Sequence, residues 1–311
     1  MPLMHLQSIE PEPTIRQETV MAGRILVVVV LYNKRFDEIP CAAKIKGWLD
    51  QPASGGADLH LAHCLVYDNS PVTLASTLSG HARMSWLQNP LNGGTRAAYL
   101  AGVDMALAHG CPWILLLDHD TDLPADFFMA ADHALAHAAP GLVIAAVIPQ
   151  VFDGAAQVSP SWITSYGRVY RLSKGTQGSD ASAEGLTAIA SASMVQTRYL
   201  TALLPIPEAF KLDYLDHWLF REIQRQGGAL AMSSARIDHS LSVFSMQSMG
   251  LERYRALLAA EHLFLQGDRS YSKVKHGLWH LARTVKLALL TRRLSLLNVC
   301  LLAARNIIRG P

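Results

Sequence analysis

An apolar run that ends in three carboxylates constrains this chain most strongly. Residues 113–117 are all apolar, and Asp118, Asp120 and Asp122 follow at alternate positions. Such a run predicts a buried strand, so its carboxyl end is the first point where charge meets solvent. Open α/β sheets bind ligands at the carboxyl ends of their strands. Two carboxylates one residue apart can both reach a divalent cation, which predicts a ligand site here.

The segments around this run alternate between strand and helix patterns. Residues 25–31 are rich in valine, as expected of a central strand buried on both faces. Alternating strands and helices form βαβ units, which predict an α/β fold with a mainly parallel, Rossmann-like sheet flanked by helices. Further strands are expected over 61–67, 84–87, 142–147 and 188–195 and around 237–239, and helices over 36–49, 100–107, 125–138 and 213–226.

The chain divides into three parts. Residues 1–22 are expected to form an irregular arm, 23–250 the α/β domain and 251–311 a basic helical region. No acidic residue follows Asp268, whereas nine lysines and arginines do. This leucine-rich basic segment predicts docking on a membrane surface, and the alternative is a helical appendage with a solvated basic face. The polar loop within 174–187 is either a lid or a plain surface excursion.

Composition limits the function classes and the compartment. Half of the 311 residues are hydrophobic and the net charge is only +2, which gives no basis for nucleic-acid binding. Four cysteines without paired spacing favour free thiols in a reducing compartment. The acidic, proline-containing N-terminus is unlike a secretory signal, and no apolar run reaches membrane-spanning length. We therefore expect a cytoplasmic protein.

Five short motifs follow one another along the chain. They are Leu31-Tyr32-Asn33, Tyr67-Asp68-Asn69-Ser70, Asn89 with Asn92-Gly93-Gly94, Leu117-Asp118-His119-Asp120-Thr121 and Phe210-Lys211-Leu212-Asp213-Tyr214-Leu215-Asp216. In order and approximate spacing they resemble the motifs of the family 2 glycosyltransferases, and their residues are most similar to those of the rhamnosyltransferase branch. The resemblance covers residues 24–245 and implies a GT-A fold, with a nucleotide-binding part at about 23–122 and an acceptor part at about 123–250.

The resemblance implies a metal and nucleotide site. Mg²⁺ or Mn²⁺ would be bound directly by Asp120, with Asp118 contacting the ribose or the water shell of the metal, and His239 would complete the metal site. Asp68 would receive the edge of the nucleobase. The residues alone leave other interpretations open. Asp118 and Asp120 can be turn and helix-cap residues, and Asp68 can form a turn with Asn69. His239 can be a core histidine whose hydrogen bonds are made within the protein.

Other residues are implied to border the nucleotide. Tyr32 and Asn33 lie at the end of the first strand, where they can border the base, although Tyr32 can equally be a packing residue. Asn92 and the pair Gly93-Gly94 form a loop whose backbone can approach a ligand, before a helix whose N-terminus favours anions. Arg96 in the first turn of this helix can reach a phosphate or remain a solvated arginine.

The resemblance also implies the chemistry. Asp216 matches the acidic residue that acts as general base, and Asp213 would cap and orient the helix. Direct displacement by an acceptor hydroxyl would invert the anomeric configuration. The implied donor is a sugar, rhamnose for this branch, linked to dTDP or UDP. The implied acceptor is a glycan or lipid-linked molecule at the inner membrane face, in cell-surface polysaccharide synthesis.

Two other functions stay open at this point. A noncatalytic nucleotide-sugar-binding or scaffold protein can have the same fold while Asp213 and Asp216 merely begin a helix. A sugar nucleotidyltransferase is less favoured, because the N-terminal part carries no glycine-rich, basic signature for a triphosphate. One departure from the family concerns residues 190–193, Ala-Ser-Ala-Ser, which stand where the family commonly has a serine-glycine-serine turn.

Overall fold

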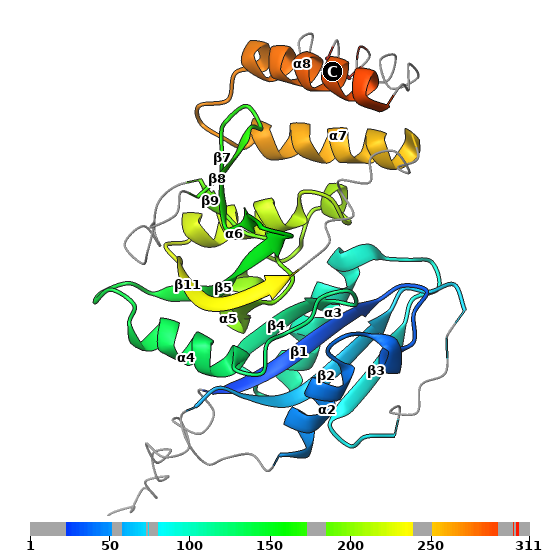
Figure 1. Ribbon diagram of the computed structural model, residues 1–311, viewed down its shortest axis with the longest axis vertical. Coiled ribbons are helices and arrows are strands. Elements are labelled where there is room, and N and C mark those ends of the chain that lie inside the picture. The colour runs from blue at the N-terminus through cyan, green and yellow to red at the C-terminus, as the bar shows by residue number, and fades with distance from the viewer. Residues whose placement is uncertain are drawn as a thin grey trace, which may run out of the picture.

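The computed structural model describes residues 23–51, 58–72, 74, 80–172, 185–238, 251–291, 301 and 303–304 (Figure 1). The N-terminal arm, residues 174–184 of the expected polar loop and His239 lie outside this part of the chain. The main sheet has the order β11-β5-β10-β4-β1-β2-β3, with β6 paired to β5. Its strands are β1 (Arg24–Leu31), β2 (His60–Asp68), β3 (Met84–Gln88), β4 (Trp113–Asp118), β5 (Ile144–Asp153), β6 (Ala156–Ser159), β10 (Ser193–Gln196) and β11 (Ala229–Asp238).

Most neighbours in this sheet run parallel. β1 is parallel to both β2 and β4, β2 is parallel to β3, and β11 is parallel to β5, whereas β10 runs antiparallel between β4 and β5. A second sheet of three short strands, β7 (Ser161–Ile163), β8 (Val169–Arg171) and β9 (Leu186–Thr187), lies beside it in the described part. The predicted α/β fold with a mainly parallel sheet flanked by helices is confirmed.

Helices cover both faces of the main sheet because its central strands are apolar on both faces. In β1, Leu26 and Val28 pack into one core with α3 (Gly94–Ala108), α5 (Thr197–Ala202) and α6 (Leu215–Arg225). Ile25 and Val27 pack into the other core with α2 (Ala42–Asp50) and α4 (Phe127–Ala136). Successive residues of a strand point to opposite faces, so the valine-rich run serves both cores.

One predicted helix is interrupted in the structure, and one predicted strand is partly replaced by a turn. The helix expected over 36–49 is divided into η1 (Phe36–Glu38) and α2, because Pro40 lies between them and has no backbone N–H for a continuous helix. The strand expected over 188–195 is wrong in its first part. Residues 190–193 form a turn in which the Ser193 amide donates to the Ala190 carbonyl at 2.9 Å. Ala192 has a φ of +63°, which no extended strand allows.

The predicted C-terminal helical region consists of α7 (Leu251–Gln266) and α8 (Lys273–Thr291) in the described residues. Figure 1 shows the two helices side by side at the end of the molecule farthest from β2 and β3, beyond α6. Two arginines of α6 join it to α7. Arg221 donates to the Phe264 carbonyl at 2.5 Å and lies 3.9 Å from the Phe264 ring centre, and Arg225 donates to the Gly267 carbonyl.

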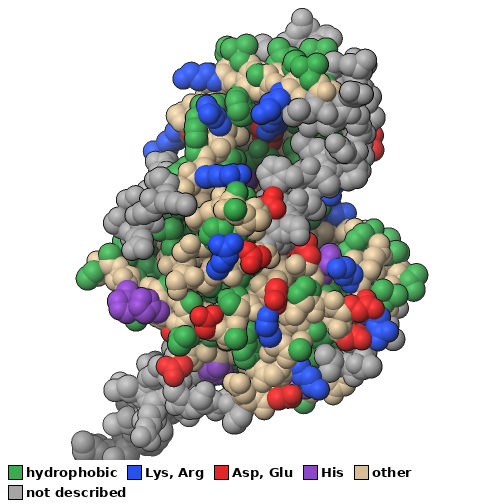
Figure 2. Space-filling view, viewed as in Figure 1, with side chains coloured by type: hydrophobic (Ala, Val, Ile, Leu, Met, Phe, Trp, Pro, Cys, Tyr) green, Lys and Arg blue, Asp and Glu red, His purple; other side chains and the backbone are tan. Residues whose placement is uncertain are grey.

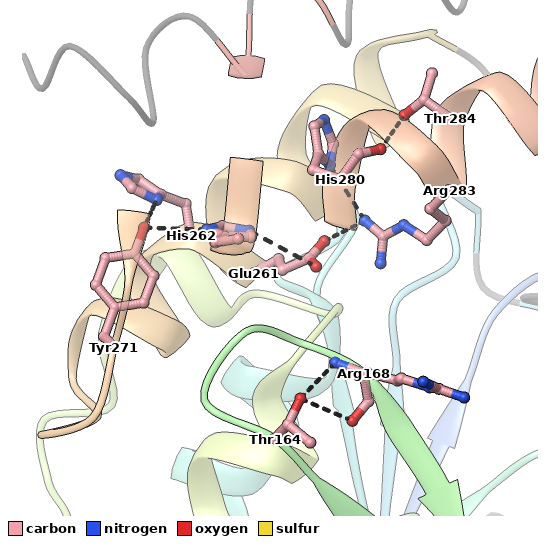
Figure 3. Close-up of polar contacts among 9 residues, drawn as sticks. Thr164, Arg168, Glu261, His262, Tyr271, His280, Arg283 and Thr284 are labelled. Atoms are coloured by element: carbon pink, nitrogen blue, oxygen red, sulfur yellow. Dashed lines mark hydrogen bonds and ion pairs between the residues drawn. The ribbon is translucent and has the colours of Figure 1, made fainter. Parts of the chain in front are cut away.

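Polar side chains fill part of the contact between α7 and α8 (Figure 3). Glu261 of α7 is buried, and its Oε2 accepts a hydrogen bond from Arg283 Nη2 at 2.5 Å. The Tyr271 hydroxyl lies 3.0 Å from Nδ1 of the buried His276. Burial, followed by neighbouring cationic groups, lowers the pKa of His276 and of His280 to about 4. Both rings are therefore neutral at neutral pH, and the 3.9 Å approach of His276 to Glu261 is not an ion pair.

This burial predicts a change in the pH dependence of stability when His280 is replaced by leucine. An unfolded chain protonates the histidine near pH 6.5, whereas the folded chain resists protonation until about pH 4. The unfolded state therefore binds the extra proton, and His280 destabilises the fold as pH falls through this window. Glu261 opposes the shift, while Arg283 and His276 favour it.

When pH is lowered from 7.5 to 5, the free energy of unfolding should fall less for His280→Leu than for the unaltered protein. The two decreases should differ by on the order of 1–2 kcal/mol. Urea unfolding at both pH values measures this difference. His137→Leu, which removes an exposed rather than a buried histidine, is the control measured beside it. Equal slopes for His280→Leu and the unaltered protein would show that His280 is not held neutral.

Candidate active site

The carboxyl ends of three neighbouring strands meet at one edge of the main sheet. In the parallel pairing of β1 with β2, Leu31 lies opposite Asp68, and in its pairing with β4, Val30 lies opposite Asp118. The Asn69 amide donates to the Leu31 carbonyl at 2.9 Å, which extends the register past the strand ends. The structure thus brings together the ends of three predicted motifs that lie far apart in the sequence.

Four carboxylates of two distant motifs gather near this edge. Burial, followed by the charges of Asp120 and Asp216, raises the pKa of Asp118 to about 7. Asp216 in turn raises the pKa of Asp213, after the larger effect of burial and against the charge of a neighbouring arginine. Burial, followed by the charges of Asp118 and Asp216, raises the pKa of Tyr99 in α3. The Tyr99 hydroxyl therefore lies near both of these carboxylates. The sequence motifs around residues 118 and 216 therefore lie near one another at this edge of the sheet.

A turn that the sequence assigned to a strand supports Asp118. The Asp118 amide donates to the Ser191 hydroxyl oxygen at 2.9 Å, and this hydroxyl lies 2.8 Å from that of Thr121. The Ala192 amide donates to the Leu116 carbonyl at 2.7 Å, which fixes the turn against β4. Ser191 was missed as a site residue, although the departure at residues 190–193 marked its position. The left-handed φ of Ala192 favours glycine, the residue common at this turn in the resembling family.

The arrangement of Asp118 and Asp120 fits a hard divalent cation. Burial first, and then the charge of Asp120, disfavours the ionised form of Asp118, and a bound cation would oppose both effects. Mg²⁺ commonly takes one or two protein carboxylates and completes its shell with water and phosphate oxygens. The described residues contain no group of three or more side chains suited to a metal. His239, the predicted third ligand, lies outside them.

The segment that carries Asp213 and Asp216 differs from the predicted helix start. α6 begins at Leu215 with Tyr214 as its N-cap, so the predicted capping role of Asp213 is wrong. Tyr214 adopts a left-handed conformation with a φ of +63°, which turns the chain before the helix starts. The Asp213 carboxylate approaches α7 instead, where Arg253 Nη2 lies 3.7 Å from its Oδ1. Asp216 lies in the first turn of α6.

The C-terminal helices hold Tyr214 in this conformation. Its ring centre lies 5.5 Å from that of Phe264 on α7 and 5.2 Å from that of His217. Its hydroxyl lies near the Glu261 and Arg283 side chains of the contact between α7 and α8. A bulky residue in the left-handed region costs on the order of 1–3 kcal/mol, and surrounding contacts must offset this cost. The C-terminal helices therefore support the backbone that carries Asp216.

Polar groups after β1 and β2 form the opposite end of the site. The Ser70 amide donates to Asp68 Oδ1 at 2.9 Å, so the buried Asp68 carboxylate has a fixed orientation. The Asn33 amide donates to the Ser70 hydroxyl oxygen at 2.8 Å. Tyr32 is 46% exposed, so packing inside a core does not account for it. In the described part of the chain, the buried Oδ1 of Asn69 has no hydrogen-bond partner, so this oxygen is available to a water molecule, an ion or a ligand.

The glycine loop before α3 packs against the chain itself. The Gly94 amide donates to Asn92 Oδ1 at 3.2 Å, and Gly94 has a φ of +71°. A Cβ at Gly94 would overlap the Lys211 carbonyl oxygen, and one at Gly93 would lie 2.5 Å from the Asn89 amide nitrogen. These glycines permit close approach of two motifs, as well as any approach to a ligand.

Arg96 is partly engaged within the protein. Its Nε donates to the Ile206 carbonyl at 2.7 Å, and its amide donates to the Lys211 carbonyl at 3.2 Å. The solvated alternative therefore does not describe it. Its contact with a phosphate stays a prediction.

The glycine loop carries a stability prediction. Gly94→Ala should lower the free energy of unfolding by about 2–5 kcal/mol, since it adds left-handed strain to a steric overlap with Lys211. Gly154→Ala is the matched control, because Gly154 has a φ of +60° and nothing within 4 Å of an added Cβ. It should lose only about 1–2 kcal/mol. Denaturant unfolding measures both, and equal losses would contradict the predicted contact.

Comparisons with known proteins give distant structural likenesses. No protein-family model matches the chain, and no curated protein matches it. The structure of GalNAc-T7 with UDP, GalNAc and Mn²⁺ resembles it with 12% identity and a TM-score of 0.47, over 70% of this chain and 43% of that chain. This chain therefore spans less than half of the GalNAc-T7 chain.

Two structures of S. aureus TarS 1–349 resemble the chain at a similar level. One has 9% identity and a TM-score of 0.46, over 92% of this chain and 90% of the other. The complex with UDP-GlcNAc has 11% identity and a TM-score of 0.46, over 82% and 70%. Likenesses this distant carry no statement about chemistry, so the function has to be inferred from the site of this chain.

Proposed function

We propose that this protein is an inverting, metal-dependent glycosyltransferase with a GT-A fold, which transfers a sugar from a nucleotide diphosphate. One observation carries the proposal. Asp118 and Asp120 at the end of β4 lie close enough to Asp216, almost a hundred residues later, for its charge to raise the pKa of Asp118. A pair of carboxylates suited to a cation beside a separate carboxylate suited to proton transfer is what such a transfer requires.

Each carboxylate has a distinct part in the proposed reaction. Asp216 removes the proton from an acceptor hydroxyl as that oxygen attacks the anomeric carbon. The bond between this carbon and the diphosphate oxygen breaks, and the nucleoside diphosphate leaves with the electron pair. Attack opposite the leaving group inverts the configuration. Asp118 and Asp120 would hold a divalent cation, which would neutralise charge on the diphosphate.

The nucleotide would lie along the edge formed by β1, β2 and β4. Asp68 and Tyr32 border the base in this proposal, and the N-terminus of α3 behind Gly94 favours the diphosphate through its helix dipole. Asp213 contributes by its contact with Arg253, which ties the segment before Asp216 to α7. The proposed donor is linked to dTDP or UDP, with rhamnose as the first sugar to test.

The acceptor and the location belong to the same proposal. In this proposal the acceptor is a glycan or lipid-linked molecule at the cytoplasmic face of the cell membrane, and the reaction belongs to cell-surface polysaccharide synthesis. The basic C-terminal helices support the membrane location. The alternative is a noncatalytic nucleotide-sugar-binding protein. This alternative is less favoured because Asp216 lies near the Asp118 carboxylate. Asp216 also lies in the first turn of α6, as the alternative requires.

A donor panel tests the proposal. The protein is incubated with dTDP- and UDP-linked sugars, Mg²⁺ or Mn²⁺ and lipid or glycan extracts, and release of nucleoside diphosphate is measured. The proposal predicts acceptor-dependent release that stops when the metal is chelated. Calorimetric binding of a donor, without release in the presence of any acceptor, would favour the noncatalytic alternative.

A further inference from the structure

The outer face of α8 carries an apolar stripe that no described part of the chain covers. Its members recur at helical spacing and fall on one side of the helix. They are between 37% and 74% exposed. We call this the α8 stripe: Val274, Leu278, Leu281, Val285 and Leu289.

The inward face of α8, about a third of a turn from the α8 stripe, is unusually polar. His276, His280 and Thr284 are fully buried against the rest of the protein, together with the smaller Ala288. The His280 Nε2 atom is buried without a hydrogen-bond partner in the described part of the chain. A helix that serves only a soluble domain buries its apolar side and exposes its polar side. In α8 the inward side is polar and the α8 stripe faces outward. The stripe is therefore available to a partner outside the described part of the chain.

Charge beside the stripe identifies the partner. Lys275 and Lys286 are exposed and lie on one flank of the α8 stripe, about a quarter of a turn from its centre. No acidic residue follows Asp268 anywhere in the sequence. Figure 2 shows hydrophobic and cationic side chains together over α8 at the end of the molecule. Apolar side chains flanked by cations match an anionic lipid surface, where leucines enter the acyl boundary and lysines contact the headgroups.

We propose that α8 docks in the plane of an anionic membrane surface through the α8 stripe, with Lys275 and Lys286 at the headgroups. Within the described residues, no helix is long and apolar enough to cross a bilayer. The helix would lie along the surface, and α7 would connect it to the segment that carries Asp216. The α8 stripe would be the surface that holds the protein at the proposed membrane location. Membrane docking by this stripe does not depend on glycosyl transfer.

Vesicle flotation with the full-length protein tests the proposal. Vesicles of phosphatidylcholine with phosphatidylglycerol should retain the protein, and Leu278→Gln/Leu289→Gln should weaken binding by about tenfold or more. Leu107→Gln, on the exposed side of α3, is the control and should bind as the unaltered protein does. Lys275→Gln/Lys286→Gln should lower binding to anionic vesicles by about tenfold and leave binding to pure phosphatidylcholine unchanged.

Two results would overturn the proposal. One is equal binding by the stripe variant and the Leu107→Gln control. The other is a dimer, seen by analytical ultracentrifugation without lipid, that the stripe variant dissociates, since a second copy would then cover the stripe. Circular dichroism of each variant confirms its fold. Because flotation requires no donor, a protein that binds vesicles but transfers no sugar would contradict only the proposed function.

Discussion

Replacing Asp216 with asparagine is expected to lower glycosyl transfer about 10²–10⁴-fold, which is the usual contribution of a positioned general base. The side chain keeps its size and can still accept the hydrogen bond that the His217 amide donates to Asp216 Oδ1 at 2.9 Å. Folding and donor binding should therefore be retained, and the loss should appear in kcat rather than in KM. Initial rates over a range of donor concentrations measure this separation.

Glu222→Gln is the control for this prediction. Glu222 lies in the same helix and pairs with Arg225 at 2.8 Å on a partly exposed surface, away from the carboxylate cluster. Its replacement should change the rate little, because surface ion pairs contribute about 0–1 kcal/mol. A rate for Asp216→Asn within a few fold of that of Glu222→Gln would remove Asp216 as the base and favour a helix-start role.

The second large effect is expected at Asp120. Asp120→Ala should lower metal-dependent transfer by about 10³-fold, because a bound cation supplies several kcal/mol of charge stabilisation and each 1.36 kcal/mol is tenfold in rate. It should also abolish the increase in nucleoside diphosphate affinity that Mn²⁺ causes in the unaltered protein. Calorimetric titrations with and without Mn²⁺ measure this second effect independently of turnover.

Asp122 supplies the matched control two residues further on. Its carboxylate is exposed and pairs with Lys44 at 2.6 Å, which accounts for it without a ligand. Asp122→Ala should keep both transfer and the effect of Mn²⁺ on binding. If Asp120→Ala and Asp122→Ala behave alike, the carboxylate pair at the end of β4 does not hold the metal.

The strand framework was predictable because it rests on short-range patterns. The apolar runs of β1, β2 and β4 identify buried strands, and parallel strands bring their carboxyl ends to one edge. Asp68 and Asp118 could therefore be assigned to one region before any contact was known. The break at Pro40 was also readable in principle, since proline ends helical hydrogen bonding.

The supports of the site depend on contacts between distant segments. Ser191 reaches the Asp118 amide only because the chain turns beside β4 before it enters β10. In the sequence, Ala-Ser-Ala-Ser alternates apolar and polar residues as a strand does. The left-handed Tyr214 is held by the packing of Phe264 and by the hydroxyl contact with Glu261. Local sequence favours neither conformation, so tertiary contacts determine both.

The inward polar face of α8 illustrates the same limit. Helical spacing predicts an amphipathic helix, but it does not say which side faces the protein. The buried pairing of Glu261 with Arg283 and the burial of His276 determine the orientation, and these contacts span two helices. The sequence indicated a basic, leucine-rich segment, whereas the exposed stripe required the structure.

A crystal structure of the protein with a nucleoside diphosphate and Mn²⁺ tests the central claim most directly. The account predicts that the nucleobase contacts Asp68 and that the diphosphate and the metal contact Asp118 and Asp120. The Asp216 carboxylate should face the position that the sugar of a donor would occupy. A nucleotide bound away from the ends of β1, β2 and β4, with neither Asp118 nor Asp120 near the metal, would contradict it.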